Sequence, residues 1–394
     1  MRILHTSDWH VGKVLKGRGR HEEHIRVLAQ VVEIARAERP DLVIIAGDLY
    51  DTAAPTADAT RVVTRALTAL RQAGAQVVAI GGNHDNGPAL DALRPWAEAA
   101  GIILRGAVRD KADELLIKGE TAGGEKWQLV TLPFLSQRYA IRAAEMYELT
   151  AAEANQTYAD HIARLIERLS DQFDQPGVIN LVTAHLTIVG ASTGGGEREA
   201  HTIMGYAVPA TVFPRNAHYV ALGHLHRAQS VIAPCPTRYS GSPLAVDFGE
   251  EENVSSVAVV DVATDKAARV RDVPIGSAIA LRTVRGTLEQ LATVNLPDAW
   301  LRVLVREKPR VGLREDVQEL LPNALEVRID PEMMPNRAGE RMAQRAGRSP
   351  RELFGDYLDS RDNAEDGVRE LFDELYDEVS TVASGSAERS GAGS

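Results

Sequence analysis

The chain has 394 residues, of which 44% are hydrophobic and 25% are charged, values typical of a globular protein with a sizeable core. This composition excludes a wholly disordered chain, a collagen-like repeat and a small disulfide-stapled domain. The formal net charge of −11 argues, taken alone, against a nucleic-acid binder, because such proteins usually carry a basic surface. The charge is uneven, since residues 351–378 hold eleven acidic and three basic side chains.

Three features of the sequence bear on its cellular compartment. Cys235 is the single cysteine, so an intrachain disulfide is excluded. The N-terminus lacks the apolar core of a signal peptide, and no stretch approaches the roughly 20 apolar residues that span a bilayer. We therefore expect a cytoplasmic protein.

The first 274 residues alternate short apolar runs with helical patterns, as in βα units. Strands are predicted over 3–6, 42–46, 77–80, within 114–132, over 178–184 and at three places between 219 and 273. Helices are predicted over 22–38, 58–72, 89–99 and 138–169. This order favours an α/β fold in which sheets pack together with helices outside.

The pattern changes after residue 274, which marks the end of the first predicted domain. Residues 275–335 read as a small α+β domain, 336–348 as a basic linker, 349–383 as a helical tail and 384–394 as disordered. The tail begins with the capping box Ser349-Pro350-Arg351-Glu352. Its apolar side chains recur at helical spacing on an acidic segment: Leu353, Phe354 and Tyr357, then Val368, Leu371, Phe372 and Leu375. They pack either on the protein's own core or, as the flexible position favours, on a partner.

Five short polar motifs each follow a predicted strand. They are Asp8-Trp9-His10, Gly47-Asp48-Leu49-Tyr50-Asp51, Gly82-Asn83-His84-Asp85, Ala184-His185 and Gly223-His224-Leu225-His226. The carboxyl ends of strands are where α/β proteins gather ligands, and residues two apart in an extended segment point the same way. We therefore expect these side chains to meet.

The motifs contain seven candidate metal ligands: Asp8, His10, Asp48, Asn83, His185, His224 and His226. Carboxylate, imidazole and amide ligands together suit Mn²⁺, Fe²⁺ or Zn²⁺ better than Mg²⁺ alone. Seven ligands are too many for one tetrahedral zinc and are enough for two metals bridged by a carboxylate, for which Asp48 is the expected residue.

This ordered set resembles the calcineurin-like metallophosphoesterase superfamily over roughly residues 1–270. The resemblance implies a β-sandwich flanked by helices and two metal sites. One metal would be held by Asp8, His10, Asp48 and His226, and the other by Asp48, Asn83, His185 and His224. His84 would face the substrate phosphate as the catalytic, non-ligand histidine. Asp51 or Asp85 would orient it, and the sequence does not decide between them.

A narrower resemblance is to the SbcD family, the nuclease subunits of the bacterial SbcCD DNA-repair complex. It is carried by Ser7–Lys13, Ala46–Thr52, Ala184–Thr187, Tyr219–His226, Tyr239–Leu244 and Ser349–Phe354. It implies Mn²⁺-dependent hydrolysis of DNA, by ATP-dependent exonuclease action on double strands and endonuclease action on single strands and hairpins. It also implies that the 275–335 domain is a DNA-binding cap, that the tail binds an SbcC-type ABC ATPase, and that helices of the nuclease domain form a homodimer.

The basic run Lys13, Lys16, Arg18 and Arg20 follows the first motif and is either a solvated face or a DNA phosphate contact.

Two other functions fit part of the sequence. A phosphodiesterase for a small molecule such as a cyclic nucleotide would need neither cap nor tail. A non-catalytic scaffold of the same fold would not need the complete ligand set.

Overall fold

The computed structural model describes residues 1–108, 112–136, 158–197, 206–333, 354–355, 358 and 367–376. It comprises two compact units, residues 1–305 with 309–328 and residues 306–308 with those from 329 onward. The predicted linker, segment 384–394, and Leu353 and Tyr357 of the tail lie outside the described residues. Among the described residues, no helix is both long and apolar enough to cross a membrane.

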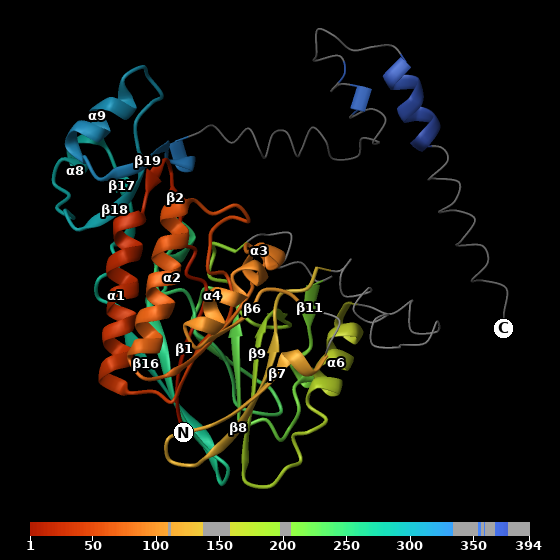
Figure 1. Cartoon of the computed structure of the whole chain (residues 1–394). Helices are drawn as coiled ribbons and strands as arrows, with labels where there is room; N and C mark the ends of the chain where they lie inside the picture. Colours follow the sequence, from red (N-terminus) through yellow and green to blue (C-terminus); the bar gives the residue numbers. More distant parts are fainter. Residues whose placement is uncertain are drawn as a thin grey trace. The chain divides into compact units, whose positions relative to one another are not determined.

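The first unit contains two six-stranded sheets (Figure 1). The first sheet has the order β16-β15-β1-β4-β5-β6. Its strands are β1 (Arg2–Thr6), β4 (Leu42–Ile45), β5 (Gln76–Ile80), β6 (Ile102–Arg105), β15 (Ser256–Ala263) and β16 (Lys266–Pro274). Strands β1, β4, β5 and β6 run parallel, so their carboxyl ends share one edge. β15 pairs antiparallel with β1, and β16 antiparallel with β15.

The second sheet has the order β13-β14-β12-β9-β8-β7. Its strands are β7 (Leu116–Glu120), β8 (Lys126–Leu132), β9 (Val178–His185), β12 (Tyr219–Gly223), β13 (Gln229–Val231) and β14 (Thr237–Tyr239). Buried side chains of both sheets form one cluster, in which Ile44 and Val78 meet Leu129, Leu181 and Ala221. The predicted β-sandwich is therefore confirmed.

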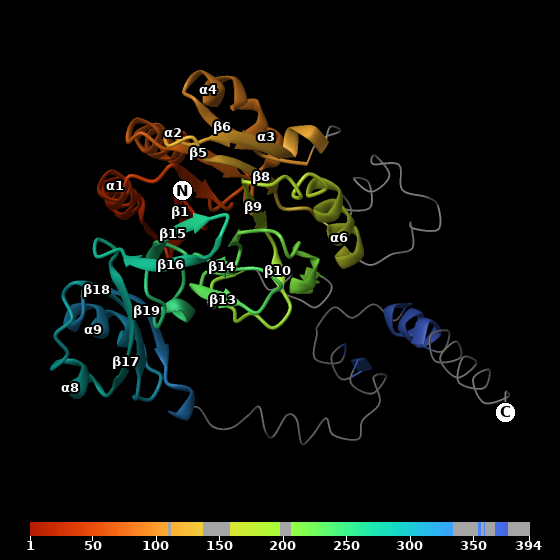
Figure 2. The ribbon, with the colours of Figure 1, turned by 90° about the horizontal axis from the view of Figure 1, so that it is seen from below.

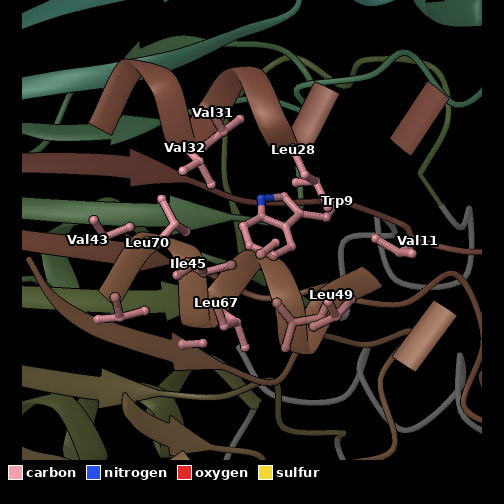
Figure 3. Close-up of a cluster of buried hydrophobic side chains, with 14 of the residues drawn as sticks. Trp9, Val11, Leu28, Val31, Val32, Val43, Ile45, Leu49, Leu67 and Leu70 are labelled. Atoms are coloured by element: carbon pink, nitrogen blue, oxygen red, sulfur yellow. The ribbon is translucent and has the colours of Figure 1, made fainter. Parts of the chain in front are cut away.

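Helices cover the outer faces of the sandwich (Figure 2). They are α1 (His21–Glu38), α2 (Ala57–Gln72), α3 (Gly87–Ala92) and α4 (Arg94–Ala99) on the first sheet and α6 (Tyr158–Leu169) on the second. Trp9 lies in the core under α1 and α2, beside Leu28, Leu67 and Ile45 (Figure 3). The single helix predicted over 89–99 is wrong: Leu93 ends α3 and precedes α4, and Pro95 in the first turn of α4 cannot continue the hydrogen bonds of α3.

The segment predicted as the cap contains a three-stranded sheet of order β17-β18-β19, formed by β17 (Ala280–Gly286), β18 (Ala299–Val305) and β19 (Ala324–Ile329). Its helices are α8 (Leu288–Leu291) and α9 (Leu313–Leu320). The cap packs on the β2–β3 hairpin (Val14–Leu15 and Arg18–Gly19) and on α1. There the Trp300 indole N–H donates to Glu23 over 2.9 Å, and the guanidinium of Arg18 lies 4.8 Å above the Trp300 ring.

Candidate metal centre

Sharp turns at the ends of the central strands bring the five motifs together. Asp8, His10, Asp48 and His224 all have backbones in the left-handed region, with φ between 46° and 104°. Non-glycine residues adopt this conformation only when their surroundings enforce it, and such strain concentrates at functional sites. The turn after β5 also passes so close to Asp48 that a Cβ at Gly82 would collide with it.

The structure brings the seven predicted ligands together, and six of them are buried while Asn83 is half-buried. The first group is Asp8, His10 and His226, whose ligand atoms lie within 4.8 Å of one another. In it the Nε2 atoms of His10 and His226 face each other at 3.1 Å. Two imidazole nitrogens and a carboxylate directed at one point form a suitable donor set for a divalent cation.

The second group gathers around Asn83. Its amide oxygen lies 2.8 Å from both Nε2 of His185 and Nδ1 of His224. Asp48 lies between the two groups, because its Oδ2 is 3.6 Å from Nε2 of His10 and 3.5 Å from Nε2 of His185. The residues present therefore fit two divalent cations sharing one carboxylate.

A further layer of acceptors orients the ligand histidines. Nδ1 of His185 donates to the carbonyl of Ala46 over 2.8 Å, which directs its Nε2 toward Asp48 and Asn83. Nδ1 of His226 lies 2.6 Å from Oε1 of Glu250. Glu250 is not among the residues predicted from the sequence, since it follows no strand motif and lies 24 residues beyond His226.

The electrostatics of the site differ sharply from one side chain to the next. Burial raises the pKa of Asp8 to about 6 and lowers the pKa of His10 to about 3. Burial also disfavours a charged Asp48, but His185 and His10 outweigh it and hold the pKa of Asp48 well below its usual range. In return, and against burial, Asp48 raises the pKa of His185 to about 9. Burial likewise opposes charge on His226, yet Glu250 raises its pKa to about 10.

The two carboxylates predicted to orient His84 have other partners. Nδ1 of His84 lies 2.8 Å from the backbone carbonyl of Asp51, and its backbone N–H donates to Asp48 over 2.8 Å. The Asp51 carboxylate is 3.5 Å from Nδ1 of His10 and 3.3 Å from Nζ of Lys13. Asp85 accepts backbone N–H groups of Leu49, Tyr50 and Gly82. The orienting role thus falls on a backbone carbonyl, while Asp85 ties two ligand loops together.

The basic run is divided between the surface and the interior. Lys13 and Lys16 pair with Asp51 and Glu326, at 3.3 and 3.4 Å. Arg20 is only 1% exposed, and its guanidinium binds both oxygens of Glu23 over 3.1 and 2.7 Å. This burial contradicts the predicted DNA contact of Arg20, because its donors are already used inside the protein.

Comparisons with known proteins agree with the fold. The family model for calcineurin-like phosphoesterases matches residues 1–228, and the model described as a type 5 capsule protein repressor C-terminal domain matches residues 278–362. Among curated proteins, the chain is 32% identical to the SbcD subunit of the nuclease SbcCD of Bacillus subtilis (strain 168) over 325 residues, covering 80% of this chain and 81% of the relative.

Two further relatives are SbcD subunits of the same nuclease. The protein of Escherichia coli (strain K12) is 32% identical over 317 residues, covering 77% of each chain. That of Rhodobacter capsulatus is 33% identical over 283 residues, covering 68% of each chain.

The sandwich, the buried ligand cluster and the match over residues 1–228 define a calcineurin-like phosphoesterase, which needs divalent metal for its hydrolysis. The relatives narrow this class further, because they match about four-fifths of the chain, and a second family model matches residues 278–362. The chain belongs to the SbcD family of nuclease subunits, and it is a metal-dependent nuclease.

The raised pKa of His226 gives the metal-free protein a defined pH dependence. A histidine whose pKa is raised on folding stabilises the fold fully below its unfolded pKa of about 6.5, and this stabilisation is lost as pH rises toward the folded value of about 10. In EDTA, the free energy of unfolding measured with urea should therefore fall between pH 7 and 9.5, and less steeply in His226→Gln. His21→Gln on α1 serves as a control that should keep the wild-type slope. Equal slopes for wild type and His226→Gln would refute the assignment.

Proposed function

We propose that this chain is a DNA nuclease that uses two Mn²⁺ ions and acts in the cytoplasm with an SbcC-type ABC ATPase in DNA repair. The observation that carries the proposal is the position of Asp48, buried between His10 and His185 at 3.6 and 3.5 Å, where one carboxylate reaches two ligand groups. Relatives described as SbcCD nuclease subunits support the choice of DNA as the substrate.

In this proposal each ion takes four protein ligands. One is held by Asp8, His10, Asp48 and His226, and the other by Asp48, Asn83, His185 and His224. Mn²⁺ suits this mixture of nitrogen and oxygen donors, with Mg²⁺, Fe²⁺ and Zn²⁺ as the alternatives. When bound, the two ions supply charge neutralisation for the phosphate and lower the pKa of water at the site.

His84 is the proposed proton donor to the leaving oxygen. Its Nδ1 is engaged with the carbonyl of Asp51, so proton exchange with the substrate is assigned to Nε2. The ring packs edge-on against His10, with centroids 4.6 Å apart, which keeps it beside the metal ligands. Asp51 contributes through its backbone carbonyl, and Asp85 contributes by holding the loops.

DNA contacts are proposed for Lys13, Lys16 and Arg18 and for the cap domain over 275–335. Lys13 lies beside Asp51 at the edge of the site, so its charge is well placed for a phosphate. By analogy with the family, the substrates are double-stranded ends, cut as an ATP-dependent exonuclease, and single strands or hairpins, cut as an endonuclease.

The partner ATPase is proposed to bind the tail, residues 349–383, behind the linker 336–348. In helix 367–376, Val368, Leu371 and Leu375 are 40–55% exposed, and the ring of Phe372 stacks on Phe354 at 4.0 Å. An apolar stripe left in solvent is typical of a helix that docks on another surface. A homodimer is proposed through the helices of the nuclease domain, where Leu93 and Trp96 are half-buried beside the core.

The function is tested by incubating the protein with Mn²⁺ or Mg²⁺ and linear, hairpin and circular single-stranded DNA. Mn²⁺-dependent cleavage is expected for the wild type, and loss of cleavage for Asp48→Ala, because both metal groups lose their shared carboxylate. Cleavage of cyclic nucleotides but of no DNA would favour the small-molecule phosphodiesterase instead.

His84→Asn should keep both metals and lower the cleavage rate by about a hundredfold or more, because proton transfer is lost while the ligands remain. Metal content is measured by elemental analysis after gel filtration, and cleavage on the same DNA substrates. An equally active variant with normal metal content would contradict the role.

Truncation after Gly347 should abolish binding to the partner ATPase and leave Mn²⁺-dependent hydrolysis of a small phosphodiester unchanged, because the catalytic unit ends before the tail. Co-purification measures the first effect and hydrolysis of bis-p-nitrophenyl phosphate the second. Retained binding would show that the partner docks elsewhere.

A further inference from the structure

The imidazole of His226 is held from both sides. Its Nε2 lies 3.1 Å from Nε2 of His10 in the first ligand group, and its Nδ1 lies 2.6 Å from Oε1 of Glu250. Glu250 is 1% exposed, and its second oxygen accepts the backbone N–H of Val246 over 2.9 Å. Both oxygens of this buried carboxylate are therefore engaged, which fixes the ring it contacts.

A tight loop packs against the same carboxylate. Glu197 accepts the backbone N–H of His226 over 2.9 Å and the N–H groups of Gly194 and Gly195 over 2.5 and 2.8 Å. Gly196 lies directly against Glu250, where a Cβ would collide with Oε1. This loop thus closes one side of the space around the Glu250 carboxylate.

Glu250 belongs to a single turn, η5 (Phe248–Glu250), whose neighbouring residues contact the cap. Phe248 is 1% exposed and packs with Leu281 of β17, and the guanidinium of Arg302 on β18 lies 5.3 Å above its ring. Glu251 pairs with Arg302 at 3.9 Å, and its carbonyl accepts from Arg282 over 3.2 Å. One short turn therefore contacts two cap strands and a metal ligand at once.

We propose that Glu250 is a positioning residue for the ligand His226, and that the η5 turn makes the metal affinity of this site depend on how the cap is docked. This rests on the proposed two-metal function. A ligating histidine is usually oriented by a hydrogen bond to its other nitrogen, and losing that partner typically lowers metal affinity by about 10- to 100-fold. A movement of η5 would also move Glu250 and so alter its hydrogen bond to His226. The contacts of Phe248 and Glu251 with the cap therefore influence metal binding through Glu250.

The test measures Mn²⁺ binding to the metal-free full-length protein by titration calorimetry. For Glu250→Ala we expect the dissociation constant of one of the two ions to rise by about 10- to 100-fold, with the other ion little affected. Glu250→Gln keeps an oxygen for Nδ1 of His226 and should recover part of the loss. It also keeps the proposal testable if the alanine variant fails to fold. The positioning role would be overturned if both Glu250→Gln and Glu250→Ala bound Mn²⁺ with the affinity of the wild type. If only the glutamine variant folds, unchanged Mn²⁺ affinity in that variant would overturn it. An equal rise in the dissociation constants of both ions would also overturn the positioning role.

The link to the cap is tested by Arg302→Gln, alone and combined with Glu250→Gln. Alone, Arg302→Gln should raise the dissociation constant of the same Mn²⁺ ion several-fold. In the double variant it should raise that constant little further, because both changes act on one hydrogen bond. Arg310→Gln, which removes the cap's pair with Asp316, is the matched control and should leave Mn²⁺ binding unchanged. Full additivity, or no effect of Arg302→Gln, would overturn the cap dependence. A wild-type protein that binds no Mn²⁺ would instead overturn the proposed function itself.

Discussion

The carboxylate of Asp48 is 1% exposed, and burying a charged group costs several kcal/mol unless partners compensate for it. The compensation comes from His10, His185 and the backbone N–H of His84, which surround it at 2.8–3.6 Å. Each of these partners comes from a different strand end. The three strand ends must therefore converge, because the buried Asp48 carboxylate is stable only where these partners surround it.

The rigid sandwich holds the strand ends in this convergent arrangement. In the turn after β1, Asp8 and His10 lie at the site, while the Trp9 side chain lies in the core under α1 and α2 (Figure 3). The Trp9 indole N–H donates to Thr6 over 3.1 Å, so even this buried side chain has its polar atom satisfied. One tripeptide thus connects the metal ligands to the largest hydrophobic cluster, and the left-handed backbones of Asp8 and His10 are held by that packing.

Charge is distributed in this chain by role. The net charge of −11 comes mainly from the acidic stretch 351–378, so it says little about the nuclease domain and cap. In the metal-free protein, the carboxylates of Asp8, Asp48 and Glu250 face the imidazoles of His185 and His226. The pKa values of these two histidines are raised, so both rings can carry a positive charge beside the carboxylates. Divalent cations would replace those protons and add positive charge where a phosphate must approach. Overall acidity is therefore compatible with an anionic substrate.

Local pattern alone predicted sheets packed together with helices outside and, because five polar motifs each follow an apolar run, the seven candidate ligands. It did not predict strands β6, β13 and β14 of the two sheets. It misjudged features that depend on neighbours distant in sequence. Arg20 reads as a surface cation beside Lys13 and Lys16, yet Glu23 and the carbonyl of Ala245 enclose it. Residues 89–99 read as one helix, although Pro95 divides them. Only the tertiary structure decided that the carbonyl of Asp51 orients His84 and that Glu250 orients His226, because a hydrogen-bond partner is chosen by position in space, and sequence patterns carry no signal for it.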